Sequence, residues 1–110
     1  MNYIDFEAGN KTYKLRLNTR NVVMLEKQLG CNPLAIFGEG ETIPTITTMV
    51  TILHSSLQQY NHGISLNDAY DIFDTYLENH SSTDFIPVIL EIYKASGIIP
   101  DDKKREEKNA

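Results

Sequence analysis

The segment from Tyr3 to Leu17 constrains the fold most, because it has the pattern of a β-hairpin that cannot be stable alone. Apolar and charged side chains alternate on both sides of Gly9-Asn10, a two-residue turn signal. The expected register pairs Phe6 with Tyr13, Asp5 with Lys14, and Ile4 with Leu15. One face of the ribbon is therefore apolar. Since an isolated hairpin is marginally stable in water, this face has to pack on the helices that follow.

Helical signals begin directly after the hairpin. The first helix is expected to start with Thr19 as its N-cap and to end at Gly30, a residue suited to a left-handed C-cap. Residues 33–37 predict a short turn of helix. A second helix carries its apolar stripe over residues 46–60.

Two more helices are predicted in the second half of the chain. Ser65, followed three residues later by Asp68, indicates a capping box at the start of the third helix. Its expected core face consists of Leu66, Ala69, Tyr70, Phe73 and Leu77. The fourth helix is expected to begin near Phe85 and to end at Gly97. The fold class is therefore α+β, with an N-terminal β-hairpin packed on a bundle of about four helices.

Composition fits a single cytoplasmic domain. The chain has 110 residues, a formal net charge of -5 and one cysteine, so an intrachain disulfide is impossible. We expect a domain over residues 1–100 and a disordered charged tail over 101–110, which has no apolar residue before Ala110. The N-terminus lacks the pattern of a signal peptide, and the apolar run at 85–90 is too short to span a membrane. The negative charge argues against a nucleic-acid partner, and no membrane partner is expected either.

No residue pattern in the chain favours catalysis. The histidines, His54, His62 and His80, have no spacing typical of a metal site, and Cys31 has no catalytic motif around it. Gly38-x-Gly40 lacks the lysine and hydroxyl residue of a phosphate-binding loop. We therefore expect a protein that is not an enzyme and needs no cofactor.

Surplus apolar positions on two helices predict a partner-binding surface. In the fourth helix they form a second stripe of Ile86, Leu90 and Tyr93, and Ile72 and Tyr76 do the same in the third. Beside them, Asp71, Asp74 and Glu78 form an acidic line that would meet basic residues of the partner. Two alternatives stay open: the fourth helix is buried on both sides, or the acidic line is a plain solvated face.

A helix-turn-helix is a further alternative, with the third helix as the DNA reader. Against it stands the charge of this helix. From Leu66 to Leu77 it has three acidic residues and no basic one, and each carboxylate would oppose binding to phosphates.

The chain also resembles the small tail assembly chaperones of long-tailed bacteriophages and prophages of Gram-positive bacteria. The resemblance covers residues 3–97 and has no catalytic signature. It lies in the hairpin Phe6 to Leu17, Leu15-Arg-Leu-Asn-Thr-Arg20, Leu25-Glu-Lys-Gln-Leu-Gly30, Asn32-Pro-Leu34, Leu57-Gln-Gln-Tyr60, Ile64-Ser-Leu66 and Ala95-Ser-Gly97.

This resemblance implies a non-enzymatic protein of the host bacterial cytoplasm. Such chaperones coat the tape measure protein before tail tube subunits polymerise around it, and they are not expected in the mature virion. The implied partners are the tape measure protein, further copies of the same chain and the tail tube protein. A structural tail component that remains in the virion is the alternative within the same class.

Overall fold

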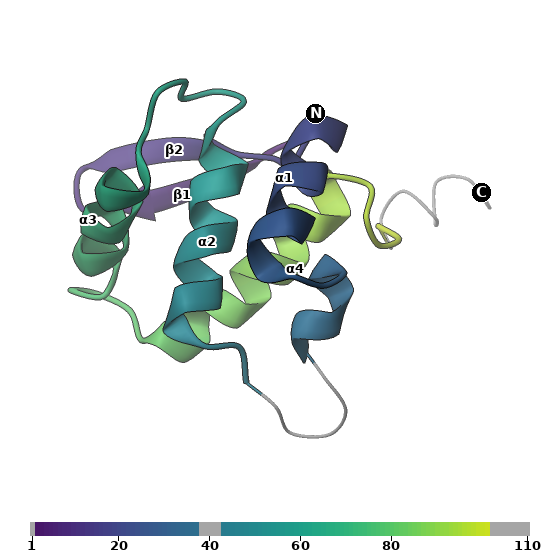
Figure 1. Ribbon diagram of the computed structural model, residues 1–110. Coiled ribbons are helices and arrows are strands. Elements are labelled where there is room, and N and C mark those ends of the chain that lie inside the picture. Colours follow the sequence, from purple (N-terminus) through teal and green to yellow (C-terminus); the bar gives the residue numbers. More distant parts are fainter. Residues whose placement is uncertain (1, 38–42, 102–110) are drawn as a thin grey trace, which may run out of the picture.

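A computed structural model describes residues 2–37 and 43–101 of the chain. It has a two-stranded antiparallel hairpin followed by four α-helices, which confirms the predicted α+β class (Figure 1). Apart from Asp101, the predicted charged tail lies outside the described residues.

The hairpin has the predicted register. Strands β1 (Ile4–Ala8) and β2 (Lys11–Leu15) pair Ile4 with Leu15, Asp5 with Lys14 and Phe6 with Tyr13. Gly9 takes a φ of +64° at the first loop position, as a type II′ turn requires. The apolar face is the buried one, and its most buried members are Phe6, Ala8, Leu15 and Leu17.

Hydrogen bonds of three backbone groups tie the second strand and its exit to the helices and their ends. The amide of Arg16 donates to the carbonyl of Ser56 at 2.9 Å, and the side-chain amide of Asn61 donates to the carbonyl of Lys14 at 3.3 Å. The amide of Leu17 donates to the hydroxyl of Ser96 at 2.9 Å. The hairpin is thus fixed to the helices by directional bonds as well as by its apolar face.

Helix α1 (Thr19–Leu29) begins one residue differently from the prediction. Its N-cap is Asn18 and not Thr19, because the Asn18 side chain accepts the amide of Asn21 at 2.9 Å. Gly30 ends the helix in the left-handed conformation, as expected, with a φ of 72°. The 3-10 helix η1 (Pro33–Phe37) follows.

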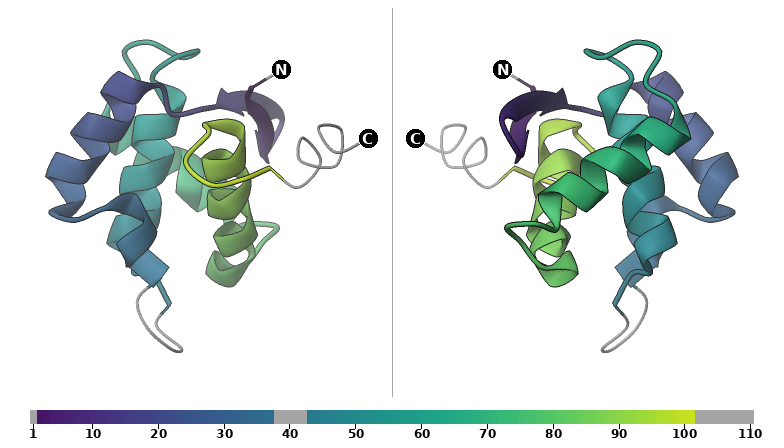
Figure 2. Two further views of the ribbon diagram at one scale, coloured as in Figure 1. Left: turned by 90° about the vertical axis from the view of Figure 1, so that its right-hand side faces the viewer. Right: turned by 90° about the vertical axis from the view of Figure 1, so that its left-hand side faces the viewer.

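Helix α2 is the centre of the bundle. It spans Ile46–Leu57 and packs against α1, α4, β2 and helix α3 (Leu66–Tyr76) (Figure 1). In the right-hand view of Figure 2, α3 crosses the bundle obliquely. The predicted capping box of α3 is present, since the side chains of Ser65 and Asp68 each accept the other's amide.

Helix α4 (Phe85–Ala95) lies beneath the hairpin and closes the core. It is preceded by the 3-10 turn η2 (Ser82–Asp84), which is capped by Ser81. Pro87 stands in its first turn, where a missing amide is tolerated.

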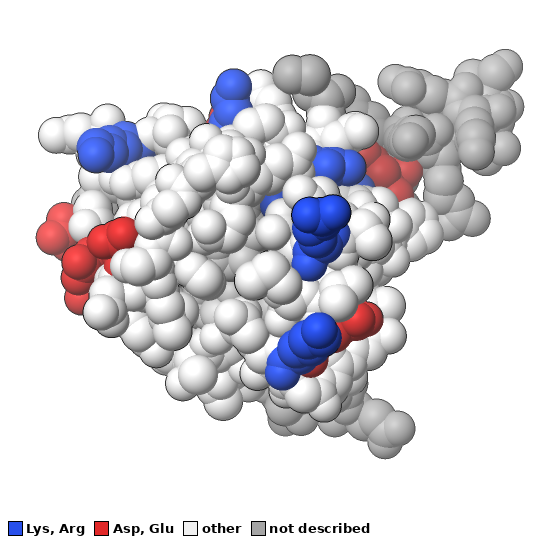
Figure 3. Space-filling view, turned by 45° about the horizontal axis from the view of Figure 1, so that its top comes forward, with Lys and Arg blue, Asp and Glu red and all other residues white. Residues whose placement is uncertain are grey.

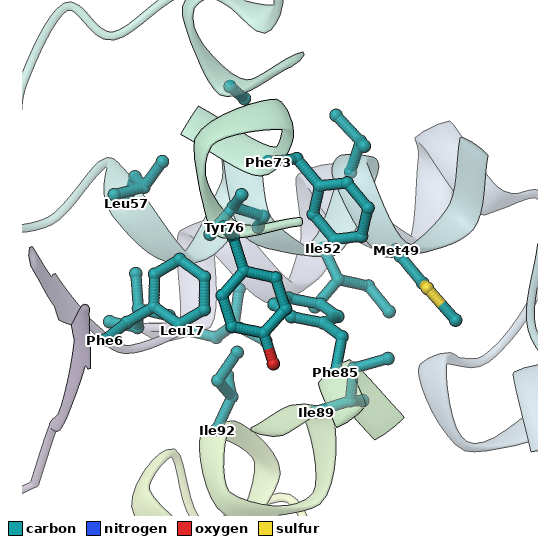
Figure 4. Packing of buried hydrophobic residues seen from close by; sticks show 14 of the residues in the cluster. Phe6, Leu17, Met49, Ile52, Leu57, Phe73, Tyr76, Phe85, Ile89 and Ile92 are labelled. Atoms are coloured by element: carbon teal, nitrogen blue, oxygen red, sulfur yellow. The ribbon is translucent and has the colours of Figure 1, made fainter. Parts of the chain in front are cut away.

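An aromatic cluster from three elements sets the rotation of α3 about its own axis. Tyr76 packs against Phe6, Phe73 and Phe85 with ring centroids 4.9, 5.9 and 5.8 Å apart. Figure 4 shows the Tyr76 ring between Phe6 and Phe85. Since Tyr76 turns inward, the buried face of α3 consists of Ala69, Phe73 and Tyr76.

The core face predicted for the third helix was therefore partly wrong. Ala69 and Phe73 are buried as expected, but Leu66, Tyr70 and Leu77 are 41%, 43% and 38% exposed. Because Tyr76 lies in the core, these three side chains lie on the side of the helix that faces solvent.

Gly9→Ala tests the contact between the hairpin turn and α3. A Cβ at Gly9 would lie 2.8 Å from Cγ2 of Thr75, which is closer than the two atoms can pack. The positive φ of Gly9 is a second cost for an alanine at this position. We expect a loss of about 2–3 kcal/mol in the free energy of unfolding, measured by urea denaturation.

Two further variants separate these causes. Gly63→Ala has a φ of +87° but meets nothing within 4 Å, so it should cost only about 1 kcal/mol. Thr75→Ser removes the obstructing methyl group and should recover part of the Gly9→Ala loss. If Gly9→Ala lowers the free energy of unfolding equally with threonine and with serine at position 75, the contact is contradicted.

Candidate interaction surfaces

The predicted partner-binding residues fall into two groups in the structure. Asp71, Asp74 and Glu78 are all exposed, and Leu90 is 37% exposed. Ile72 and Ile86 are half-buried and pack against the edge of the core. These six side chains remain accessible, at least in part.

Tyr93 and Tyr76 are corrections to the predicted surface, because both are core residues. Tyr93 is fully buried, and its hydroxyl donates to the carbonyl of Pro33 at 3.0 Å. Tyr76 is 5% exposed and belongs to the aromatic cluster. The second apolar stripe of α4 is thus divided between a buried Tyr93 and an exposed Leu90, so the helix is more central than predicted.

The acidic line lies along the outer side of α3. Asp71, Asp74 and Glu78 follow one another at spacings of three and four, and the exposed row of Leu66, Tyr70 and Leu77 lies beside them. Sequence reasoning missed this apolar row because it assigned these residues to the core. The available signal was the excess of apolar positions on the helix, which leaves at least one stripe outside.

A shallow pocket lies where the hairpin meets α3. Its volume is about 360 Å³, and it is lined by Ala8, Asn10, Lys11, Tyr13, Asp71, Ile72 and Thr75. It has one cation and one carboxylate over an apolar floor. No group in it is a nucleophile paired with a base, so the pocket has no recognisable catalytic set.

The histidines and the cysteine that the sequence analysis considered are either in contact with neighbouring residues or exposed. Nε2 of His54 donates to the carbonyl of Ile64 at 3.1 Å, and Nε2 of Gln58 donates to the same oxygen at 2.8 Å. His80 stacks on Tyr76 with centroids 4.5 Å apart, and Cys31 is exposed. Within residues 2–37 and 43–101, no group of three or more metal-ligating side chains comes together.

The chain belongs to a family of unknown function (DUF6096). The model of that family matches residues 4–110, nearly the whole sequence. No curated protein and no solved structure matches the chain. In the described part of this DUF6096 protein, no helix is long and apolar enough to cross a membrane.

Replacing Tyr93 and Leu90 separately tests the corrected surface. Tyr93→Phe leaves the carbonyl of Pro33 without its buried donor, which should lower the free energy of unfolding by about 1–2 kcal/mol. Leu90→Asp changes a side chain that is 37% exposed and should cost about 0.5 kcal/mol or less. Chemical denaturation of both variants measures this, and a larger loss for Leu90→Asp would reverse the assignment.

Alkaline pH should destabilise the protein through Tyr93. Burial raises the pKa of Tyr93 well above its ordinary value, with Cys31 as the smaller cause. The unfolded chain therefore releases the phenolic proton at a lower pH than the native one, so stability falls as pH rises above about 10. Unfolding curves between neutral and alkaline pH should show a shallower fall for Tyr93→Phe, and parallel curves would contradict the titration.

Proposed function

We propose that the protein is a non-enzymatic tail assembly chaperone of a long-tailed bacteriophage or prophage. It binds the tape measure protein and shields it during tail morphogenesis. The observation that carries this proposal is the apolar surface: in the described residues, ten large apolar side chains are 37–58% exposed. Helices that offer so many apolar positions to solvent suit a protein that covers another helix.

The resemblance over residues 3–97 supplies the identity of the partner. It also supplies the place of action, the host cytoplasm, and the expectation of homo-oligomers that leave before the virion is complete. Self-association and contact with the tail tube protein belong to the same proposal.

DNA binding by α2 and α3 is the weaker candidate. The outer side of α3 would face the duplex in a helix-turn-helix, and it exposes Asp71, Asp74 and Glu78. Three carboxylates at that position oppose phosphate binding, so a gel shift with phage DNA should show no salt-dependent complex.

Co-expression tests the chaperone proposal directly. The chain is produced with the long, helix-rich protein encoded nearest downstream, and the soluble fraction is analysed by size exclusion with light scattering. We expect the partner, insoluble alone, to become soluble and to elute with several copies of this chain. A partner that still aggregates while this chain elutes alone would contradict the proposal.

Mass spectrometry of purified particles separates the chaperone from a structural tail component. A chaperone leaves before completion, so its peptides should be absent from the virion while those of the tape measure protein are present. Stoichiometric recovery from particles would favour the structural component.

A further inference from the structure

Three rows of exposed or half-buried residues lie side by side on α3, α2 and α1. Each row repeats at spacings of three, four or seven, so its members share one side of their helix. The rows are Leu66, Tyr70 and Leu77 on α3; Thr47, Thr51, His54 and Gln58 on α2; and Arg20, Met24 and Lys27 on α1. We call the three rows together the α1–α3 face.

Hydrogen bonds place the outer rows on the two sides of the α2 row. The hydroxyl of Ser55, at one edge of this row, donates to Oε1 of Gln28 at 3.3 Å, and Gln28 is one turn from Met24. At the other edge, His54 and Gln58 bond the carbonyl of Ile64, just before α3. Figure 1 shows the resulting order, with α2 between α3 and α1.

Most of the middle row is more buried than its neighbours. Thr47 is exposed, but Thr51, His54 and Gln58 are half-buried, whereas Tyr70 and Met24 are 43% and 49% exposed. No member of the α2 row carries a formal charge at neutral pH when its histidine is neutral. The face therefore has an uncharged centre between two more exposed edges, each of which includes an apolar side chain.

The margins of the face carry opposite charges. Beyond the α3 row lie Asp71, Asp74 and Glu78, and the α1 row itself includes Arg20 and Lys27. Figure 3 shows this polarity, with red atoms at the left over α3, blue atoms over α1 and an uncharged expanse between them.

We infer that the α1–α3 face binds one amphipathic helix of the partner. This helix has an apolar stripe, basic residues along its edge next to α3 and acidic residues along its edge next to α1. The inference rests on the proposed function for the identity of the partner, whereas the charge pattern of the bound helix follows from this surface alone.

The charges and the side chains of the face both favour a helix as the occupant. Tyr70 and Met24 supply the aromatic and flexible apolar contacts that interfaces use at their centres. The apolar stripe fixes the rotation of the helix about its axis. The opposite margins then fix its direction along the face, since like charges would meet if the helix were reversed end for end.

Matched leucine variants test the position of the site. Leu66→Asp and Leu34→Asp are the same change at residues that are 41% and 42% exposed, but only Leu66 belongs to the α1–α3 face. Aspartate at the first position of α3 suits the helix dipole, so the fold should persist in Leu66→Asp. With the co-expressed tape measure protein, we expect the Kd to rise about tenfold for Leu66→Asp and to stay unchanged for Leu34→Asp. The opposite order would move the site to η1 and overturn the inference.

Matched charge reversals test the polarity. Asp74→Lys and Glu7→Lys change the net charge equally, one at the acidic margin and one on the hairpin. We expect Asp74→Lys to weaken binding about threefold and to flatten its salt dependence, and Glu7→Lys to do neither. Equal effects would show that only net charge matters and would overturn the inferred polarity.

Designed helical peptides separate this inference from the proposed function. One peptide has a leucine stripe with lysines on one edge and glutamates on the other; its controls have glutamates on both edges or lysines on both. Fluorescence anisotropy should give the lowest Kd for the mixed peptide.

If the mixed peptide binds through Leu66 but the tape measure protein does not bind, the proposed function fails and the face stands. If the tape measure protein binds and Leu66→Asp has no effect, the face fails and the function stands. If the chain alone forms oligomers in light scattering and Leu66→Asp dissociates them, a second copy occupies the face instead, which would also overturn the inference.

Discussion

The packing of Tyr76 against Phe6 and Phe85 is the contact on which the rest of the structure depends. It joins β1, which is distant in sequence, to the consecutive helices α3 and α4 within one aromatic cluster. Aromatic pairs at these separations contribute about 0.5–1.5 kcal/mol each beyond the area that they bury. Because Tyr76 occupies the interior, α3 has one possible rotation about its axis. That rotation places Leu66 and Tyr70 on the surface, so the same contact that closes the core also creates the apolar row.

Hydrogen bonds to the helices satisfy the backbone amides that follow the second strand of the hairpin. Ser96 accepts the amide of Leu17 and donates to the carbonyl of Ile92 at 2.6 Å, which links the strand exit to α4. The carbonyl of Ser56 accepts the amide of Arg16 in the same region. A two-stranded ribbon in water would lose these groups to solvent, whereas here they fix its position on α2 and α4. The hairpin thus covers one side of the helical core.

Local signals in the sequence predicted most of the fold, and the errors arise where tertiary contacts decide. The hairpin register follows from a two-residue loop, and the capping box of Ser65 and Asp68 follows from residues three apart, so both were predictable. Tyr93 and Tyr76 could not be placed by periodicity, because each lies on a helix with two apolar stripes and only the packing partner selects the buried one. For Tyr93 that partner is the carbonyl of Pro33, 60 positions away in the chain. The face between α1 and α3 was beyond sequence reasoning for the same reason: it combines rows from three helices.

The length of the face determines how much of a long partner one copy of this small domain can cover. The apolar row from Leu66 to Leu77 extends about 16 Å at 1.5 Å per residue, so one copy would cover about eleven residues of a bound helix. A contact of that length with charged margins is smaller than the interfaces of permanent complexes and would dissociate readily on its own. Many copies along one long helix would protect it together, while each copy could still be displaced singly as tail tube subunits arrive. A weak, polarised and repeated contact therefore suits the proposed chaperone better than a tight one, since protection must end when the tube forms.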